Sequence, residues 1–278
     1  MKTVREVLDA SINFLKQKEI DHPRKCIEEL LSHALSLSRL ELYLQFDRPL
    51  QSKELDQMRE YLKAAAKGEP WQYIVGQVEF LECTIKVERG VLIPRQETEI
   101  LADRVIKELP EEPCVIWDIC CGSGCLGVAI KKKRPDCIVI LSDLSEEAVK
   151  IAKENGQRCG VDVEVRQGDL LGPFEGDKAD IVICNPPYIS ERDFQGLGLE
   201  VKEWEPKMAL VGGVTGFEFY ERLAAELPLY LKSGAKVYLE IGAGMGKGIK
   251  EMFSSLKWGS VEVTQDWASH DRFVLAKI

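Results

Sequence analysis

From residue 114 onward, short apolar and β-branched runs alternate with helical stretches, and this alternation constrains the fold more than any other feature. The strands that we expect are 114–119, 138–142, 161–166, 179–184, 235–241, 261–264 and 272–276. Helical stretches at 126–133, 145–157 and 217–231 separate the first five. Strands joined by crossover helices pair in parallel and carry helices on both faces. The pattern therefore predicts an α/β fold with a doubly wound, mostly parallel seven-stranded sheet.

The last two strands differ from the others because only a short loop, 266–271, joins them. A parallel pair needs a long crossover connection, whereas a tight loop can join an antiparallel pair. We therefore expect a terminal antiparallel hairpin at one side of the sheet.

The N-terminal region shows helical periodicity instead. Apolar residues recur at steps of three or four at Val4, Val7, Leu8, Ile12 and Leu15. We expect a second helix with Asp21 as its cap and Pro23 in its first turn. A third helix should begin at Ser52 and stop near Gly68. These elements predict a small helical domain.

A change of character follows the helices. The segment 69–96 contains two β-like runs, 73–78 and 83–87, and predicts a β-hairpin linker. We therefore divide the chain into a helical domain at 1–68, this linker, and an α/β domain at 97–278.

A glycine-rich loop follows the first strand of the predicted sheet. Gly122, Gly124 and Gly127 match the pattern G-x-G-x-x-G, in which glycines allow the backbone to approach a ligand closely. Asp143 ends the second strand 19 residues after Gly124, the spacing of a carboxylate that accepts ribose hydroxyls. NAD-type dinucleotides and S-adenosylmethionine both need this arrangement, and the loop alone does not choose between them.

Two further acidic residues bear on the ligand. Asp118 precedes the glycines, where it could reach an ammonium group and would repel a pyrophosphate. Gly168, Asp169 and Leu170 end the third strand, where the edge and face of an adenine would be held. The first of these observations favours S-adenosylmethionine.

The fourth strand runs into the sequence Asn185-Pro186-Pro187-Tyr188. Proline fixes its own φ and restricts the residue before it, so this loop is stiff. It presents two acceptors, the Asn185 side-chain oxygen and the Pro186 carbonyl, beside the aromatic face of Tyr188. A planar NH₂ group fits this arrangement, because both N–H bonds find acceptors. The loop resembles that of the amino-methyltransferases, which methylate adenine, cytosine or the glutamine amide nitrogen.

Several separated segments are similar to the release factor glutamine methyltransferases, the HemK-type family. They are EPWQYIVG at 69–76, Phe80, VLIPRQETE at 91–99, GFEFY at 216–220 and EIG at 240–242. The resemblance spans nearly the whole chain. It implies a class I enzyme that transfers a methyl group from S-adenosylmethionine to N5 of the glutamine in the Gly-Gly-Gln motif of class 1 peptide chain release factors, leaving S-adenosylhomocysteine. It also implies that the N-terminal helices contact the factor.

The resemblance extends to individual residues. Besides Asp118 and Asp169, the implied cofactor contacts are Cys120, Cys121, Gly122, Ser123, Gly124, Asp143, Leu170 and Asn185. The implied catalytic residues are Asn185, Pro186, Pro187 and Tyr188.

Four sites depart from the family pattern. Gln96 replaces the usual second proline of Pro-Arg-Pro, which predicts a looser loop. Cys120-Cys121 replaces a common Gly-Thr pair, and Met245 stands where a glutamine often follows. Leu170 replaces an aromatic residue of some members, which predicts weaker adenine stacking.

Three other functions fit the sequence less well. An N6-adenine methyltransferase that acts on DNA or RNA uses the same loop. However, Lys+Arg 37 against Asp+Glu 46 gives a net charge of −9, whereas nucleic-acid-binding proteins are usually basic. A dehydrogenase would leave the Asn-Pro-Pro-Tyr loop unexplained, and a non-enzymatic binding module would not need Gly122, Gly124 and Asp143. We expect a protein substrate and no direct contact with nucleic acid.

Composition also bears on metal binding and location. The nine cysteines include no repeated CxxC pair, so we expect buried thiols and no metal site. No stretch approaches the roughly 20 apolar residues that cross a bilayer, and the start lacks a signal sequence. We expect a cytoplasmic monomer that does not contact membranes.

Overall fold

The computed structural model describes residues 2–256 and 258–278. The chain divides into two compact units, Met1–Gln77 with Gly198–Trp204, and Val78–Leu197 with Glu205–Ile278. The first unit therefore includes a segment that lies far along the sequence, inside the stretch that forms the second. No sequence pattern predicted that Gly198–Trp204 would belong to the first unit.

The first unit is built from helices. They are α1 (Val4–Gln17), α2 (Pro23–Leu35), α3 (Arg39–Leu44), α4 (Ser52–Ala65), α5 (Trp71–Val75) and α10 (Leu199–Trp204). The apolar stripe predicted for α1 is buried, which confirms the helical periodicity. Thr3 and Glu6 form a capping box at its N-terminus, and this box satisfies backbone N–H groups that a helix start leaves free.

One prediction about the helix starts was wrong, and one short helix was not predicted. The N-cap of α2 is His22, in the left-handed conformation and without a side-chain cap, rather than Asp21. Pro23 takes the first helical position, where its fixed φ suits the helix. The short helix α3 was missed, although Ser38 and Glu41 form a capping box at its start.

The segment 73–75 was predicted as a strand and is helical. It forms the end of α5, which begins after Pro70 and stops at Gly76, where φ is +80°. Glycine adopts this left-handed conformation without the Cβ penalty. The hairpin is therefore shorter than predicted, with β1 (Gln77–Phe80) and β2 (Cys83–Lys86).

The second unit contains a seven-stranded sheet in the order β10-β11-β9-β6-β3-β4-β5. Its strands are β3 (Val115–Ile119), β4 (Ile138–Asp143), β5 (Glu164–Gln167), β6 (Ala179–Cys184), β9 (Leu231–Glu240), β10 (Ser260–Gln265) and β11 (Asp271–Lys277). β11 pairs antiparallel with both β10 and β9, and the other neighbours are parallel. The predicted sheet and its terminal hairpin are confirmed.

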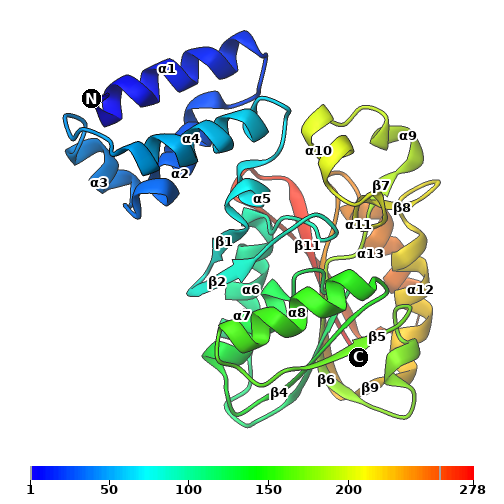
Figure 1. Cartoon of the computed structure of the whole chain (residues 1–278). Coiled ribbons are helices and arrows are strands. Elements are labelled where there is room, and N and C mark those ends of the chain that lie inside the picture. The colour runs from blue at the N-terminus through cyan, green and yellow to red at the C-terminus, as the bar shows by residue number, and fades with distance from the viewer. Residues whose placement is uncertain (1, 257) are drawn as a thin grey trace. The chain divides into compact units, whose positions relative to one another are not determined.

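Helices cover both faces of this sheet, with α6, α7 and α8 on one and α12 and α13 on the other (Figure 1). The helices of this unit are α6 (Gln96–Glu108), α7 (Cys125–Lys133), α8 (Glu146–Arg158), α9 (Glu191–Phe194), α11 (Lys207–Leu210), α12 (Glu218–Glu226) and α13 (Gly246–Ser254). Two short strands, β7 (Ile189–Ser190) and β8 (Val211–Gly213), pair outside the main sheet.

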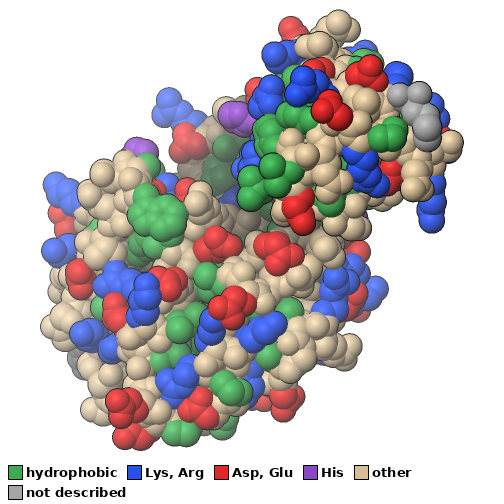
Figure 2. Space-filling model, turned by 90° about the vertical axis from the view of Figure 1, so that its left-hand side faces the viewer, with side chains coloured by type: hydrophobic (Ala, Val, Ile, Leu, Met, Phe, Trp, Pro, Cys, Tyr) green, Lys and Arg blue, Asp and Glu red, His purple; other side chains and the backbone are tan. Residues whose placement is uncertain are grey.

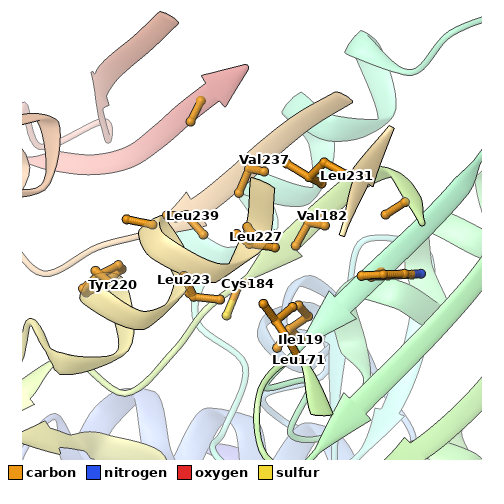
Figure 3. Close-up of a cluster of buried hydrophobic side chains, with 14 of the residues drawn as sticks. Ile119, Leu171, Val182, Cys184, Tyr220, Leu223, Leu227, Leu231, Val237 and Leu239 are labelled. Carbon is orange, nitrogen blue, oxygen red and sulfur yellow. The ribbon is translucent and has the colours of Figure 1, made fainter. Parts of the chain in front are cut away.

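The core between α12 and the sheet fixes the end of β9. Tyr220 and Leu223 of α12 are fully buried in one cluster with Val182 of β6 and Leu239 of β9 (Figure 3). The Tyr220 hydroxyl donates to the main-chain oxygen of Glu240 at 2.7 Å, so this buried polar group is satisfied. The packing therefore anchors the last residue of β9.

Some element boundaries differ from the prediction. β6 has the predicted bounds, but β5 begins at Glu164 rather than at 161. The helix predicted to reach residue 231 ends at Glu226, because Pro228 lies in the 3₁₀ turn that follows and cannot continue an α-helix. β9 consequently begins at Leu231, earlier than expected.

Candidate active site

The carboxyl ends of β3, β4, β5 and β6 surround a cavity with an empty volume of about 700 Å³, part of it open to solvent. Doubly wound folds bind ligands at this edge of the sheet. The sequence-predicted residues that line it are Cys120, Gly122, Asp143, Asp169, Leu170, Asn185 and Pro187. Val91, Leu92, Met208 and Phe219 also line it, and the sequence pattern assigned them no role.

Asp143 is held in a fixed orientation at the end of β4. Its Oδ2 accepts a hydrogen bond from the Gly122 N–H at 2.8 Å, and its Oδ1 accepts one from the Ser145 N–H at 2.9 Å. A carboxylate can accept about four hydrogen bonds, so both oxygens can still accept donors from the cavity. This geometry suits a pair of ligand hydroxyl groups.

Asp118 is placed differently from the expectation. It is completely buried and does not line the cavity. Its Oδ2 accepts from the Gly127 N–H at 2.8 Å, while its Oδ1 has no hydrogen-bond partner among the described residues. Burial raises the pKa of Asp118 to about 7, against the opposing effect of the Gly127 hydrogen bond. Asp118 thus lies beneath the glycine loop.

We expect Asp118→Asn to change how stability depends on pH. In the unfolded chain this carboxyl ionises near pH 3.8, but in the folded chain near pH 7. Between these values the unfolded state binds fewer protons, so the Asp118 contribution lowers the free energy of unfolding as pH rises, by about 4 kcal/mol in all. Urea unfolding at several pH values should show a shallower decline in the variant. Identical declines would mean that folded Asp118 titrates normally.

Three other residues predicted to contact the cofactor are buried within the glycine-rich loop instead. Cys121, Ser123 and Gly124 are buried and do not line the cavity. A Cβ on Gly124 would lie 2.9 Å from Leu141 and 3.0 Å from Ala152, so this glycine allows the start of α7 to pack on β4 and α8.

Cys120 adopts a backbone conformation that favours glycine. Its φ is +58°, in the left-handed region, where side chains other than glycine and asparagine are disfavoured. A glycine at this position, which the resemblance described above implies for the family, would relieve this strain. Cys120 also places its side chain among the cavity residues, so the departure from the family pattern alters the site itself.

The third strand contributes Leu170 and Asp169. Leu170 is buried and lines the cavity with φ at +44°. The Asp169 carboxylate pairs with the Arg222 guanidinium through two hydrogen bonds, 3.1 Å to Nη1 and 2.7 Å to Nη2. Asp169 is therefore already engaged in an ion pair at the rim of the cavity.

The Asn-Pro-Pro-Tyr loop packs tightly against β8 and the turn that follows it. A Cβ on Gly212 would lie 2.3 Å from the Pro187 carbonyl oxygen, and one on Gly216 would lie 2.3 Å from the Tyr188 carbonyl oxygen. Burial raises the pKa of Tyr188 to about 12, so the phenol is neutral at physiological pH. The two glycines fix the path of the loop by letting a second backbone approach it.

Gly212→Ala is expected to destabilise the protein and to displace this loop. A backbone carbonyl at 2.3 Å cannot yield as a flexible side chain would, and overpacking of this kind costs about 1 to 3 kcal/mol. Gly172→Ala is the matched control, because a Cβ there meets no atom within 4 Å. Urea denaturation of both variants measures the difference. Equal free energies of unfolding would contradict the packing argument.

A buried polar chain lies behind Asn185. Its Nδ2 donates to Thr98 Oγ1 at 3.4 Å, and the Thr98 hydroxyl donates to Glu240 Oε2 at 2.8 Å. Burial raises the pKa of Glu240 to about 7. Sequence reasoning missed both partners, although Thr98 and Glu240 lie within the segments 91–99 and 240–242 that carried the family resemblance.

The loop before α6 is held by a buried carboxylate. Glu205 pairs with Arg95 at 2.5 Å and accepts the Ile93 N–H at 3.2 Å. Gln96 is exposed at the first position of α6 and takes no part in these contacts. Met245 is half-buried and packs against the core.

Among the described residues, the structure holds no group of three or more His, Cys, Asp or Glu placed to bind a metal ion. All nine cysteines are free thiols. Within the same part of the chain, no helix has the length and apolar character needed to cross a membrane.

Two family models match the chain. Residues 6–76 match the PrmC N-terminal domain, and residues 91–198 match the methyltransferase small domain. Solved structures resemble this chain at low sequence identity. A methyltransferase from Pyrococcus furiosus has a TM-score of 0.54 at 18% identity and covers 80% of this chain and 98% of its own. This likeness supports the fold alone.

Curated relatives extend along nearly the whole chain. A Geobacter sulfurreducens protein is 37% identical over 276 residues, which cover 99% of this chain and 97% of its own. A Chlamydia trachomatis protein is 38% identical over 97% of this chain and 92% of its own. A Bacillus anthracis protein is 36% identical over 99% of both. All three are named release factor glutamine methyltransferase, and at this identity and coverage the chain belongs to the release factor glutamine methyltransferase family.

Proposed function

We propose that this protein transfers a methyl group from S-adenosylmethionine to the side-chain amide nitrogen of the glutamine in the Gly-Gly-Gln motif of class 1 peptide chain release factors. The observation that carries the proposal is the placement of Asn185 and Pro187 in one cavity with Gly122 and Asp143. This arrangement supports a role for the loop in holding the substrate amide beside the adenosyl group of the cofactor.

The cavity fits the cofactor of this family. Asp143 would accept the ribose hydroxyls, because both carboxylate oxygens keep free acceptor sites. A Cβ added at Gly122 would meet no protein atom within 4 Å, so the space beside this backbone is open and the cofactor could approach the loop closely. Buried Leu170 would contact the adenine face. When bound, S-adenosylmethionine supplies an electrophilic methyl group on a sulfonium.

The protein must make a poor nucleophile reactive, because the lone pair of an amide nitrogen is delocalised into the carbonyl. The Asn185 side-chain oxygen and the Pro186 carbonyl would accept the two amide protons and leave more electron density on nitrogen. The stiff loop would also align this nitrogen with the methyl group for in-line transfer. Once the methyl group is transferred, the nitrogen carries a positive charge and is strongly acidic, so its proton can leave late to water without a strong base.

The helical unit would recognise the protein substrate. Leu40 and Leu44 of α3 are exposed, at 71% and 77% of their surface, and would offer apolar contacts to a protein partner. Acidic and basic side chains are interspersed on the face of the molecule shown in Figure 2. The mixture of both signs of charge supports a protein substrate over DNA or RNA.

The experiment is incubation of the protein with S-adenosylmethionine and an unmodified class 1 release factor, followed by peptide mass spectrometry. We expect one added methyl group on the Gly-Gly-Gln peptide, and none on a factor whose motif glutamine is replaced by alanine. Labelled cofactor with total RNA or DNA provides the competing test. Transfer to nucleic acid without transfer to the factor would favour the adenine methyltransferase instead.

A further inference from the structure

We propose that Thr98 is a positioning residue that sets which end of the Asn185 carboxamide faces the substrate. The inference rests on the proposed function, since it concerns the acceptor of the amide proton. It adds a buried hydrogen-bond chain that begins at Glu240 and runs through Thr98 to the catalytic loop.

The three residues come from three different elements. Thr98 lies in the first turn of α6, Glu240 ends β9, and Asn185 follows β6. Thr98 and Glu240 are buried, with 3% and 1% of their surfaces exposed, whereas Asn185 is half-buried and lines the cavity. The hydrogen-bond chain therefore leads from the protein interior to the cavity.

The donor and acceptor groups of the three side chains determine which residue donates each hydrogen bond. An ionised Glu240 can only accept, so the Thr98 hydroxyl must donate its single proton there at 2.8 Å. The Thr98 oxygen is then left as an acceptor, and it takes the Asn185 Nδ2 hydrogen at 3.4 Å. That bond is long, as catalytic hydrogen bonds in ligand-free enzymes often are, and we expect it to shorten with substrate bound.

This direction decides what Asn185 presents to the cavity. With Nδ2 tied to Thr98, Oδ1 is the free end, and among the hydrogen bonds of the described residues none ends on it. A carboxamide turned by 180° would instead present N–H groups to the substrate amide, which also carries N–H groups. Donor would then face donor, and the substrate nitrogen would lose an acceptor for its proton.

The protonation state of Glu240 sets the direction of the whole chain. The titratable and charged groups that face it are Arg95, Glu97, Cys125, Tyr188, Tyr220 and Arg272. Burial raises the pKa of Glu240 to about 7, against the opposing effects of Thr98, Arg272 and Arg95. A protonated Glu240 can donate to Thr98, and the Thr98 hydroxyl can then donate to Asn185 Oδ1. Methyl transfer should therefore fall as pH drops below about 7.

The test compares Thr98→Val, which keeps the side-chain shape but removes the hydroxyl, with Thr98→Ser, which keeps the hydroxyl. With release factor as substrate and saturating S-adenosylmethionine, we expect the valine variant to lose about 10-fold to 100-fold in kcat, and the serine variant to stay near wild type. Affinity for S-adenosylhomocysteine, measured by calorimetry, should be unchanged in both. The acidic limb of the kcat profile should persist in the serine variant and disappear in both the valine variant and Glu240→Gln, because a glutamine side chain does not titrate in this range.

A valine variant with the kcat and pH profile of the wild type would overturn the proposal, as would equal losses in the valine and serine variants. The unchanged S-adenosylhomocysteine affinity reports that the valine variant is folded. If that affinity is lost, the Glu240→Gln pH profile decides instead, and an acidic limb that persists there also contradicts the proposed hydrogen-bond chain. Wild-type protein that fails to methylate the factor is a separate result, because it refutes the proposed function itself.

Discussion

Asn185→Ala is expected to lower kcat for methyl transfer by about 100-fold to 1,000-fold, the cost of removing one preorganised hydrogen-bonding group from a transition state. The variant loses the side-chain oxygen that we propose accepts an amide proton, so the nitrogen keeps less electron density and is less well aligned. The Pro186 carbonyl remains as a second acceptor. Single-turnover transfer to release factor measures the change, because it separates chemistry from product release.

The same variant should bind S-adenosylhomocysteine almost as the wild type does, because the contacts of Asp143 and Gly122 remain. Gln157→Ala is the control, since this carboxamide is exposed on α8. It should transfer at the wild-type rate. If Asn185→Ala also transferred at that rate, the loop would have no catalytic role for its asparagine.

Asp143→Asn is expected to weaken binding of S-adenosylhomocysteine by about 100-fold, because hydrogen bonds to a charged group contribute about 1.5 to 3 kcal/mol each. The substitution keeps the shape but removes the charge. It also turns an NH₂ group toward either the Gly122 N–H or the Ser145 N–H, both of which now donate to the carboxylate. Titration calorimetry measures the affinity directly.

Glu146→Gln is the matched control for this variant, because Glu146 is an exposed carboxylate in the first turn of α8. Its affinity should be that of the wild type. The two main variants should also differ in kind, with Asn185→Ala altering kcat and Asp143→Asn altering cofactor binding. Unchanged affinity in Asp143→Asn would place the ribose elsewhere in the cavity.

Features of the fold that depend on residues close together in the sequence could be predicted. β6 has its predicted bounds because a run of apolar residues ends at a proline-rich loop. Gly122 follows β3 and Asp143 is the last residue of β4, the next strand of the motif. The structure places the Gly122 nitrogen 2.8 Å from Asp143 Oδ2. The error at the end of α12 was also local, since Pro228 could have been read as a helix stop.

Contacts between distant residues could not be predicted in this way. Thr98 hydrogen-bonds to Asn185 across 87 positions and to Glu240 across 142. Asp169 was expected at the adenine edge, but its ion pair with Arg222 depends on how α12 packs beside the third strand. Periodicity and spacing specify which face a residue occupies and carry no information about its partner from another element.

The placement of α10 within the first unit has a consequence for protein engineering. The chain passes between the two units three times, after residues 77, 197 and 204. Within the first unit, Glu200 of α10 lines a cavity together with Asp21, His22 and Lys25. A fragment that ends at residue 77 would therefore lack one wall of this cavity. Exchange of the first unit between family members has to transplant two separate stretches of sequence.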